Sequence, residues 1–155
     1  MKKLILLLLF IPLISFSQEY FFMGNNSYIT SNPSALETNS SSSVDSDMFF
    51  RYVKDKKNDI YIVLKSEYVL KSFITNEIFI YLKNGNIIEI PVPFESDYID
   101  GMMISMYQLT DESISKITAS EIHSIRYTNS SSTKKITVSN NNWLLGKQLK
   151  EFIDN

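Results

Sequence analysis

Apolar and polar residues alternate along much of this chain with the two-residue period of half-buried strands. The runs 49–53 and 60–64 flank the charged segment Lys54–Asp59, which is the pattern of a hairpin with a loop of several residues. Three later segments have the same strand character: 102–109, 122–128 and 136–138.

A second hairpin is predicted around Asn84-Gly85, which separates the strand-like runs 78–83 and 86–90. An Asn-Gly pair accepts the positive φ angles of a two-residue type I′ turn, whose twist matches that of the strands it joins. Pro91 ends the second strand, because proline lacks the N–H that a continuing central strand would donate.

The period changes after Thr110, which is typical of a helix N-cap. Asp111 and Glu112 would lie in the first turn, where the positive helix end favours acidic side chains, and Ile114 and Ile117 would share one face. The sequence therefore predicts a short internal helix.

A second helix is predicted near the C-terminus, with one of Asn140–Asn142 as its cap. Spacings of four, seven and eight residues from the first position give one apolar stripe, formed by Leu145, Leu149, Phe152 and Ile153. We expect this stripe to cover one face of the sheet, with binding of a partner as the alternative. The predicted class is thus α+β and strand-rich: a mainly antiparallel meander sheet with one short internal helix and a C-terminal amphipathic helix packed on one face.

Residues 1–17 have the pattern of a cleavable signal peptide. Two lysines precede the apolar run Leu4–Ile14, and small residues stand at positions −3 and −1 relative to Gln18. The alternative, a retained membrane anchor, is disfavoured because this run is 11 residues long, against about 20 for a spanning helix. We therefore expect a secreted or periplasmic protein, with no membrane insertion after signal cleavage.

The start of the mature chain differs in composition from the rest. Glu19–Met23 is aromatic and strand-like, but Asn, Ser and Thr fill 14 of the 23 positions from 24 to 46. Such side chains bury little apolar surface, so segment 18–46 is predicted to be a strand-like start followed by a linker or long loop. Residues 47–155 are expected to form a single globular domain.

Charge and cysteine content exclude several classes of function. Without Lys2 and Lys3 the mature chain has 13 basic and 17 acidic residues, which gives no basic stripe for binding nucleic acid. The chain has no cysteine, so it offers no lipid-anchor cysteine, disulfide, thiolate metal site or cysteine nucleophile. We expect the core alone to stabilise the fold.

The hairpin at 78–90, the helix start at Leu109–Glu112 and the segment Glu121–Tyr127 follow one another in an order that resembles short exported proteins of Bacteroidota. The resemblance covers about residues 75–128. Those proteins have no assigned activity, so the resemblance implies no catalytic residues.

Two candidate chemistries depend on few residues. Glu95, Asp97 and Asp100 lie in one predicted acidic loop ending in Gly101, and clustered carboxylates are the ligands that calcium prefers, although their order differs from an EF-hand. His123 is the only histidine, and no Gly-x-Ser-x-Gly motif accompanies it, so we expect a surface or half-buried strand residue rather than a catalytic base.

The nine tyrosines and ten phenylalanines either pack the core or form a contact surface for a partner, with Tyr61, Tyr81 and Tyr107 on predicted strands. No catalytic or cofactor-binding residue is predicted. The sequence therefore favours an exported, non-catalytic binding or interaction module for an unknown protein or envelope component. The alternative is a small secreted hydrolase or a calcium-assisted enzyme whose site the sequence does not reveal.

Overall fold

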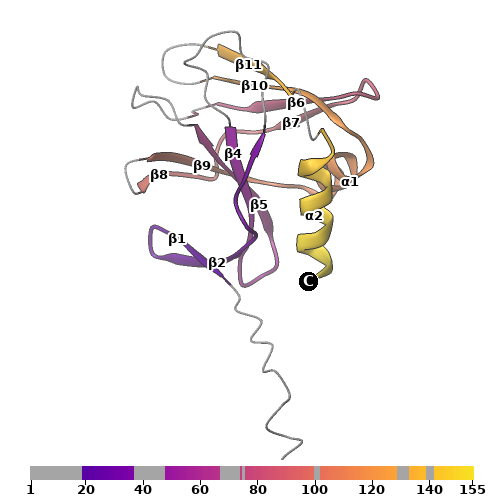
Figure 1. Cartoon of the computed structure of the whole chain (residues 1–155). Helices are drawn as coiled ribbons and strands as arrows, with labels where there is room; N and C mark the ends of the chain where they lie inside the picture. The colour runs from indigo at the N-terminus through magenta and orange to yellow at the C-terminus, as the bar shows by residue number, and fades with distance from the viewer. Residues whose placement is uncertain are drawn as a thin grey trace, which may run out of the picture.

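The computed structural model describes residues 19–36, 48–66, 74, 76–99, 102–128, 133–138 and 142–155 (Figure 1). These residues contain eleven strands and two helices. The strands are β1 (Tyr20–Met23), β2 (Asn26–Thr30), β3 (Ser34–Leu36), β4 (Met48–Lys54), β5 (Ile60–Ser66), β6 (Ile78–Leu82), β7 (Ile87–Ile90), β8 (Glu95–Ile99), β9 (Met102–Gln108), β10 (Ile122–Thr128) and β11 (Thr133–Thr137). The helices are α1 (Asp111–Ala119) and α2 (Leu144–Asp154).

The strands form two antiparallel sheets. The large sheet has seven strands in the order β1-β2-β4-β5-β9-β8, with β3 also paired to β4, and the small sheet has the order β11-β10-β6-β7. The predicted strand-rich α+β class with antiparallel pairing is confirmed. The pairs β5–β9 and β6–β10 join strands far apart along the chain, so the order of strands in the sequence does not predict them.

The large sheet is apolar on both faces. On β4 and β5, Phe50, Tyr52 and Ile62 point into the main core, whereas Val53 and Val63 point to the opposite face and join a second cluster. The main core is closed by the small sheet and by both helices. The second cluster is closed by the β1–β2 hairpin, which supplies Phe21, Met23 and Tyr28. We call this second cluster the hairpin core.

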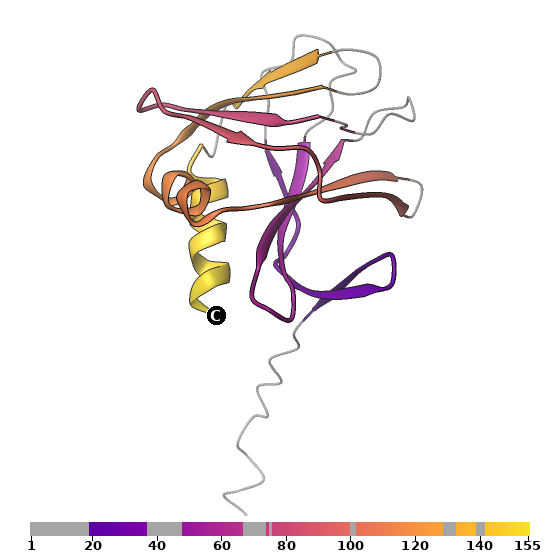
Figure 2. The same ribbon diagram turned by 180° about the vertical axis from the view of Figure 1, so that it is seen from behind.

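Helix α2 packs on the main core beside α1, as Figures 1 and 2 show. The buried Tyr52 hydroxyl donates to the carbonyl oxygen of Leu145 at 3.0 Å, and the Tyr52 ring stacks on Phe152 with 6.4 Å between centroids. Leu145, Leu149 and Phe152 are buried as the stripe predicted, but Ile153 is 42% exposed. The expected asparagine cap is wrong: the N-cap is Trp143, whose side chain makes no capping bond.

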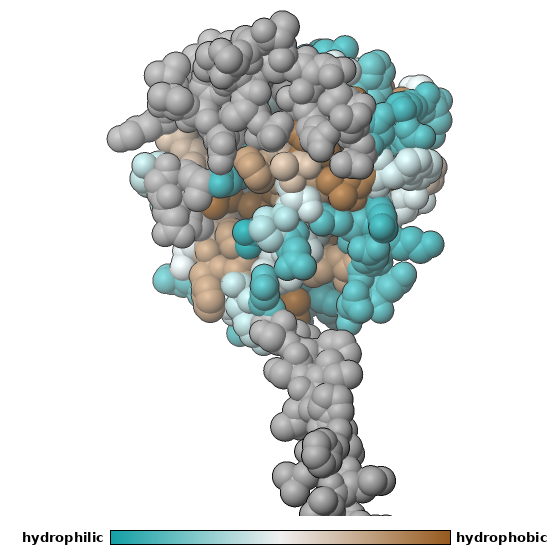
Figure 3. All heavy atoms as spheres, in the orientation of Figure 1, coloured by the Kyte–Doolittle hydropathy of each residue, from teal (hydrophilic) through white to brown (hydrophobic). Residues whose placement is uncertain are grey.

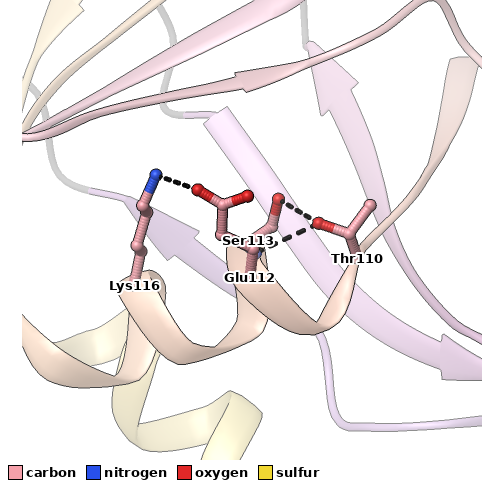
Figure 4. Close-up of polar contacts among 4 residues, drawn as sticks. All are labelled: Thr110, Glu112, Ser113 and Lys116. Atoms are coloured by element: carbon pink, nitrogen blue, oxygen red, sulfur yellow. Dashed lines mark hydrogen bonds and ion pairs between the residues drawn. The ribbon is translucent and has the colours of Figure 1, made fainter.

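The prediction for α1 is confirmed. The backbone N–H of Ser113 donates to the Thr110 hydroxyl at 3.2 Å, so the N-cap satisfies one free donor of the first turn (Figure 4). Lys116 and Glu112 form an ion pair one turn apart at 2.5 Å. Ile117 is fully buried and Ile114 packs partly against the main core.

The β6–β7 hairpin exists, but its turn differs from the prediction. Positive φ occurs at Gly85 (90°) and not at Asn84, and the backbone N–H of Gly85 donates to the carbonyl oxygen of Leu82. The loop therefore has three residues, a type I turn followed by a left-handed glycine. A type I′ turn would need positive φ at Asn84 as well.

Segment 24–46 is predicted to be a linker or long loop, yet β2 and β3 are strands of the large sheet. Residues 37–47 lie outside the described residues. Both strands pair with the same edge of β4. Between them, the Ser31 N–H donates to the Tyr52 carbonyl oxygen, and the Tyr52 N–H donates to the Ser31 hydroxyl, both at 2.9 Å. A side-chain oxygen thus takes the place of a backbone acceptor where the chain bends.

The acidic connector 95–101 is also corrected, because residues 95–99 form the edge strand β8. The predicted signal peptide, residues 1–17, lies outside the described residues. Among the helices that are described, none has the length and apolar character needed to span a membrane.

Candidate functional site

The β1–β2 hairpin lies across one face of the large sheet. Its turn, Gly24-Asn25, has positive φ at the glycine (55°) alone, which is the pattern of a type II′ turn. The turn of the hairpin contacts the edge strand β8, since a Cβ added to Gly24 would lie 2.9 Å from Oε1 of Glu95. At its other end, β2 pairs with β4 through Ile29 and Thr30.

Cross-strand partners of an antiparallel sheet share a face, so the register shows what lies beneath the hairpin. One row runs Arg51, Val63, Met106 and Glu95 over β4, β5, β9 and β8. The adjacent row runs Phe49, Lys65, Ile104 and Asp97. Phe21 packs near the first row, with its ring 5.4 Å from the Arg51 guanidinium carbon. β1 therefore lies above the first row, and the second row extends beyond it.

A groove of about 490 Å³ lies along this side of β1. Aromatic and aliphatic side chains from the hairpin and from the second row form most of its wall. Its lining consists of Tyr20, Phe21, Phe22, Pro33, Phe49, Phe50, Arg51, Val63, Lys65 and Ile104. We call it the β1 groove. Apolar surface gathers on the side of the molecule that carries the hairpin (Figure 3).

Two cations stand in this apolar wall. The Lys65 ammonium lies 5.0 Å from the centre of the Phe49 ring, and Arg51 lies over Phe21. Neither has a carboxylate within ion-pair distance among the described residues. Burial lowers the pKa of Arg51 from its usual value, and the more distant Glu19 carboxylate opposes that change. The Arg51 guanidinium remains a cation near neutral pH, and cation–π contacts hold both side chains against the wall.

The exposed rings of β1 complete the site. Tyr20 is 57% and Phe22 is 66% exposed, whereas Phe21 and Met23 are buried in the hairpin core. Sequence reasoning placed a strand at Glu19–Met23 but not a site. The signal was available in the alternation, since both neighbours of Phe21 are aromatic and one face of a strand cannot bury all three rings.

Two of the three acidic residues considered for calcium, Glu95 and Asp97, are described. Glu95 and Asp97 lie on one face of β8, where the Asp97 carboxylate accepts a bond from the Tyr98 backbone N–H at 2.7 Å. Asp100 lies outside the described residues. The described part of the chain contains no group of three or more His, Asp or Glu side chains placed to hold a metal ion.

His123 lies exposed on β10, as expected for a surface strand residue. Its neighbour Glu121 is held by Lys83 in an ion pair of 2.5 Å, which lowers the pKa of that carboxyl group through the hydrogen bond to the lysine. The neighbouring Ser124 side chain is fully buried.

Two of the three tyrosines singled out on strands lie in the core, and the third is only half-buried. Tyr61 and Tyr107 are buried and pack the core. Tyr81 is half-buried, with the Lys135 ammonium 5.4 Å from its ring centre.

Comparison with known proteins gives no match to this chain among protein-family models, characterised proteins or solved structures.

Proposed function

We propose that this chain is an exported, non-catalytic binding module and that the β1 groove is its binding surface. The observation that carries the proposal is the pair of cations, Arg51 and Lys65, in an aromatic wall without a described carboxylate partner. Bringing a cation into an apolar wall costs solvation, and a bound anion would recover part of that cost. A negatively charged ligand with apolar parts is therefore complementary to this surface.

The lining favours binding over catalysis. Its described residues supply rings, aliphatic side chains, one tyrosine hydroxyl and two cations, none of which is a carboxylate or an imidazole able to exchange a proton near neutral pH. Such a set can hold and orient a ligand. The export part of the proposal rests on the sequence of residues 1–17, with its basic start, apolar run and small residues before Gln18.

Site-directed photocrosslinking in producing cells tests the proposal. A photoreactive phenylalanine analogue at Phe22 in the groove is compared with the same analogue at Trp143, which is 50% exposed at the start of α2. We expect discrete adducts from position 22 and none from position 143. Equal adducts at both positions, or none at position 22, would contradict a binding role for the groove.

A fluorescence titration adds a test of the ligand chemistry. We expect an anionic aromatic dye, anilinonaphthalene sulfonate, to bind the folded protein and to lose on the order of tenfold in affinity in Lys65→Glu, because one favourable charge contact becomes repulsive. Lys147→Glu, a charge change at an exposed site on α2, is the matched control and should bind the dye as the wild type does.

A further inference from the structure

The outer edge of β1 borders the β1 groove and has no strand beside it among the described residues. β1 is the end strand of the large sheet and pairs with β2 alone. The Thr30 N–H donates to the Glu19 carbonyl oxygen at 3.0 Å, so Glu19 and Thr30 are a hydrogen-bonded residue pair of this ladder. In an antiparallel ladder such pairs alternate along the strand, and the N–H and C=O groups of Tyr20 and Phe22 therefore point away from β2.

We propose that the β1 groove binds an extended peptide segment, which adds to β1 as a further strand and places an acidic side chain near Lys65. This inference rests on the proposed function and names the class of partner for that same groove. The open backbone groups of Tyr20 and Phe22 supply the ladder bonds of strand addition. Backbone hydrogen bonds to β1 provide affinity for any extended peptide. The second row, Phe49, Lys65 and Ile104, forms the floor of the groove and selects the side chains.

The floor determines which side chains fit. An added strand would run across the row Phe49, Lys65 and Ile104, whose strands are spaced by about 4.8 Å. Alternate side chains of an extended peptide project to one side at intervals of about 6.7 Å, so three of them span about 13 Å, against about 10 Å from Phe49 to Ile104. With an acidic side chain centred on Lys65, the two flanking apolar side chains lie near Phe49 and Ile104, each about 2 Å outside its floor residue.

The charges of the two rows favour one position for the acidic side chain. Arg51 and Lys65 belong to β4 and β5, whereas the carboxylates of Glu95 and Asp97 belong to β8. An acidic side chain is therefore favoured at the β4–β5 end and disfavoured at the β8 end.

A single strand fits this position better than a second copy of the chain. β1 lies directly above the face of its own sheet, because Phe21 and Met23 pack into the hairpin core. If β1 strands of two copies paired around a two-fold axis, each copy would bring its own β4, β5 and β9 to the level that the other already occupies. The space beside β1 therefore admits a single extended strand but not a second sheet.

The test uses the mature full-length chain and a blocked heptapeptide, Thr-Val-Thr-Glu-Thr-Val-Thr, whose alternate residues present valine, glutamate and valine to the floor. Titration followed by NMR should perturb the amide signals of Tyr20, Phe22 and Lys65, with slower hydrogen exchange at Tyr20 and Phe22. A matched peptide with lysine in place of glutamate should bind on the order of tenfold more weakly. Lys65→Glu should reverse that preference.

Strand addition is separated from other binding modes by two variants at one position. Phe22→Thr removes the ring but keeps the outward N–H, whereas Phe22→Pro also removes the N–H without losing a bond to β2, as edge strands tolerate. We expect Phe22→Pro to bind the glutamate peptide on the order of tenfold more weakly than Phe22→Thr, from loss of one backbone hydrogen bond. Both variants should keep the wild-type circular dichroism spectrum and bind the anionic dye equally.

Each outcome decides a different point. If the glutamate peptide binds Phe22→Pro and Phe22→Thr equally, strand addition is wrong and the groove remains a binding site of another kind. If neither peptide binds but the dye and the crosslinks behave as expected, the peptide class is wrong and the proposed function stands. If sedimentation shows a dimer that Phe22→Pro abolishes, the occupant is a second copy and the inference is overturned. If dye, crosslinks and peptides all fail, both proposals fall.

Discussion

Replacing Gly146 with alanine tests how α2 is held against α1. Alanine favours a helix interior by about 1 kcal/mol over glycine, so at an open position the change would stabilise the protein. At this position a Cβ would lie 2.5 Å from the carbonyl oxygen of Ile117, and 3.4 Å from Cα of Thr118. Those atoms belong to the backbone of α1, so no side-chain rotation can relieve the contact.

The two effects differ in size. Separating the helices by the 0.5–1 Å needed to relieve such a contact forfeits about a quarter to a half of each van der Waals attraction across the gap. The gap would affect Ile117, Leu145 and Leu149, which are all fully buried. Overpacking of this kind costs about 1–3 kcal/mol, and more where the backbone must move. Because the contact is with backbone, the upper part of that range applies, about 2–3 kcal/mol. After the gain of about 1 kcal/mol in helix propensity, we expect Gly146→Ala to be destabilised by about 1–2 kcal/mol.

Urea unfolding followed by circular dichroism measures this difference, with an unchanged slope indicating unchanged surface exposure on unfolding. Lys147→Ala, one position along and exposed, is the control and should change the free energy of unfolding by less than about 0.5 kcal/mol. A Gly146→Ala variant more stable than the wild type would refute the reasoning, because the propensity gain would then exceed the packing cost.

Three further predictions follow from single residues. Gly85→Val should lower the free energy of unfolding by about 1–2 kcal/mol through backbone strain alone, because φ is +90° and no atom lies within 4 Å of an added Cβ; Gly85→Asn should cost less, and equal melting temperatures for the two variants would argue against strain. Tyr52→Phe should cost about 1 kcal/mol by removing the bond to the Leu145 carbonyl, whereas Tyr98→Phe, at an exposed ring, should melt as the wild type does. Burial, aided by the carboxylates of Asp55 and Asp59, raises the pKa of Tyr61 from 10.0 to about 12, so the folded state favours the neutral phenol. The stability that the neutral Tyr61 phenol contributes is fully present below pH 10 and is lost as the pH rises from 10 to about 12. Chemical unfolding measured over that pH range should show Tyr61→Phe losing less stability than the wild type. Parallel losses would contradict the assignment.

Local signals in the sequence predicted elements well where one rule acts alone. Thr110 followed by two acids gave the start of α1, and the stripe from Leu145 to Phe152 gave the buried face of α2. The charged segment between β4 and β5 gave that hairpin. In each case the interactions that decide the structure lie within a few residues of one another along the chain.

Sequence reasoning failed where tertiary contacts override composition. The polar segment 26–36 reads as a linker, yet Tyr28 in β2 and Leu36 in β3 are buried, and β4 supplies the backbone partners for both strands. Glu95 and Asp97 read as a loop, but pairing with β9 makes them an edge strand, where charged side chains are common. Propensity is a weak guide when half of each strand faces solvent.

The candidate site escaped prediction for a related reason. Phe49, Lys65 and Ile104 become neighbours only through the pairs β4–β5 and β5–β9, and the second pair joins residues about forty positions apart. The aromatic run at 20–22 was visible, but which ring remains exposed depends on the turn at Gly24 and on the sheet beneath it. A surface built from three strands cannot be read from any one of them.

The bend at Ser31 has a consequence for how this chain tolerates changes in length. β2 and β3 flank a bend of three residues, 31–33, and both are fixed to one edge of β4. The bend holds three residues opposite two of β4, Arg51 and Tyr52. If its shape and the pairing of β3 were kept, inserting or deleting one residue would slip β2 by one position and exchange the two sides of the hairpin, turning Phe21 and Tyr28 to solvent and Tyr20 and Phe22 toward the sheet. The number of residues in a short polar bend thus decides which aromatic rings the molecule shows, and changes of length there should be tolerated only in steps of two.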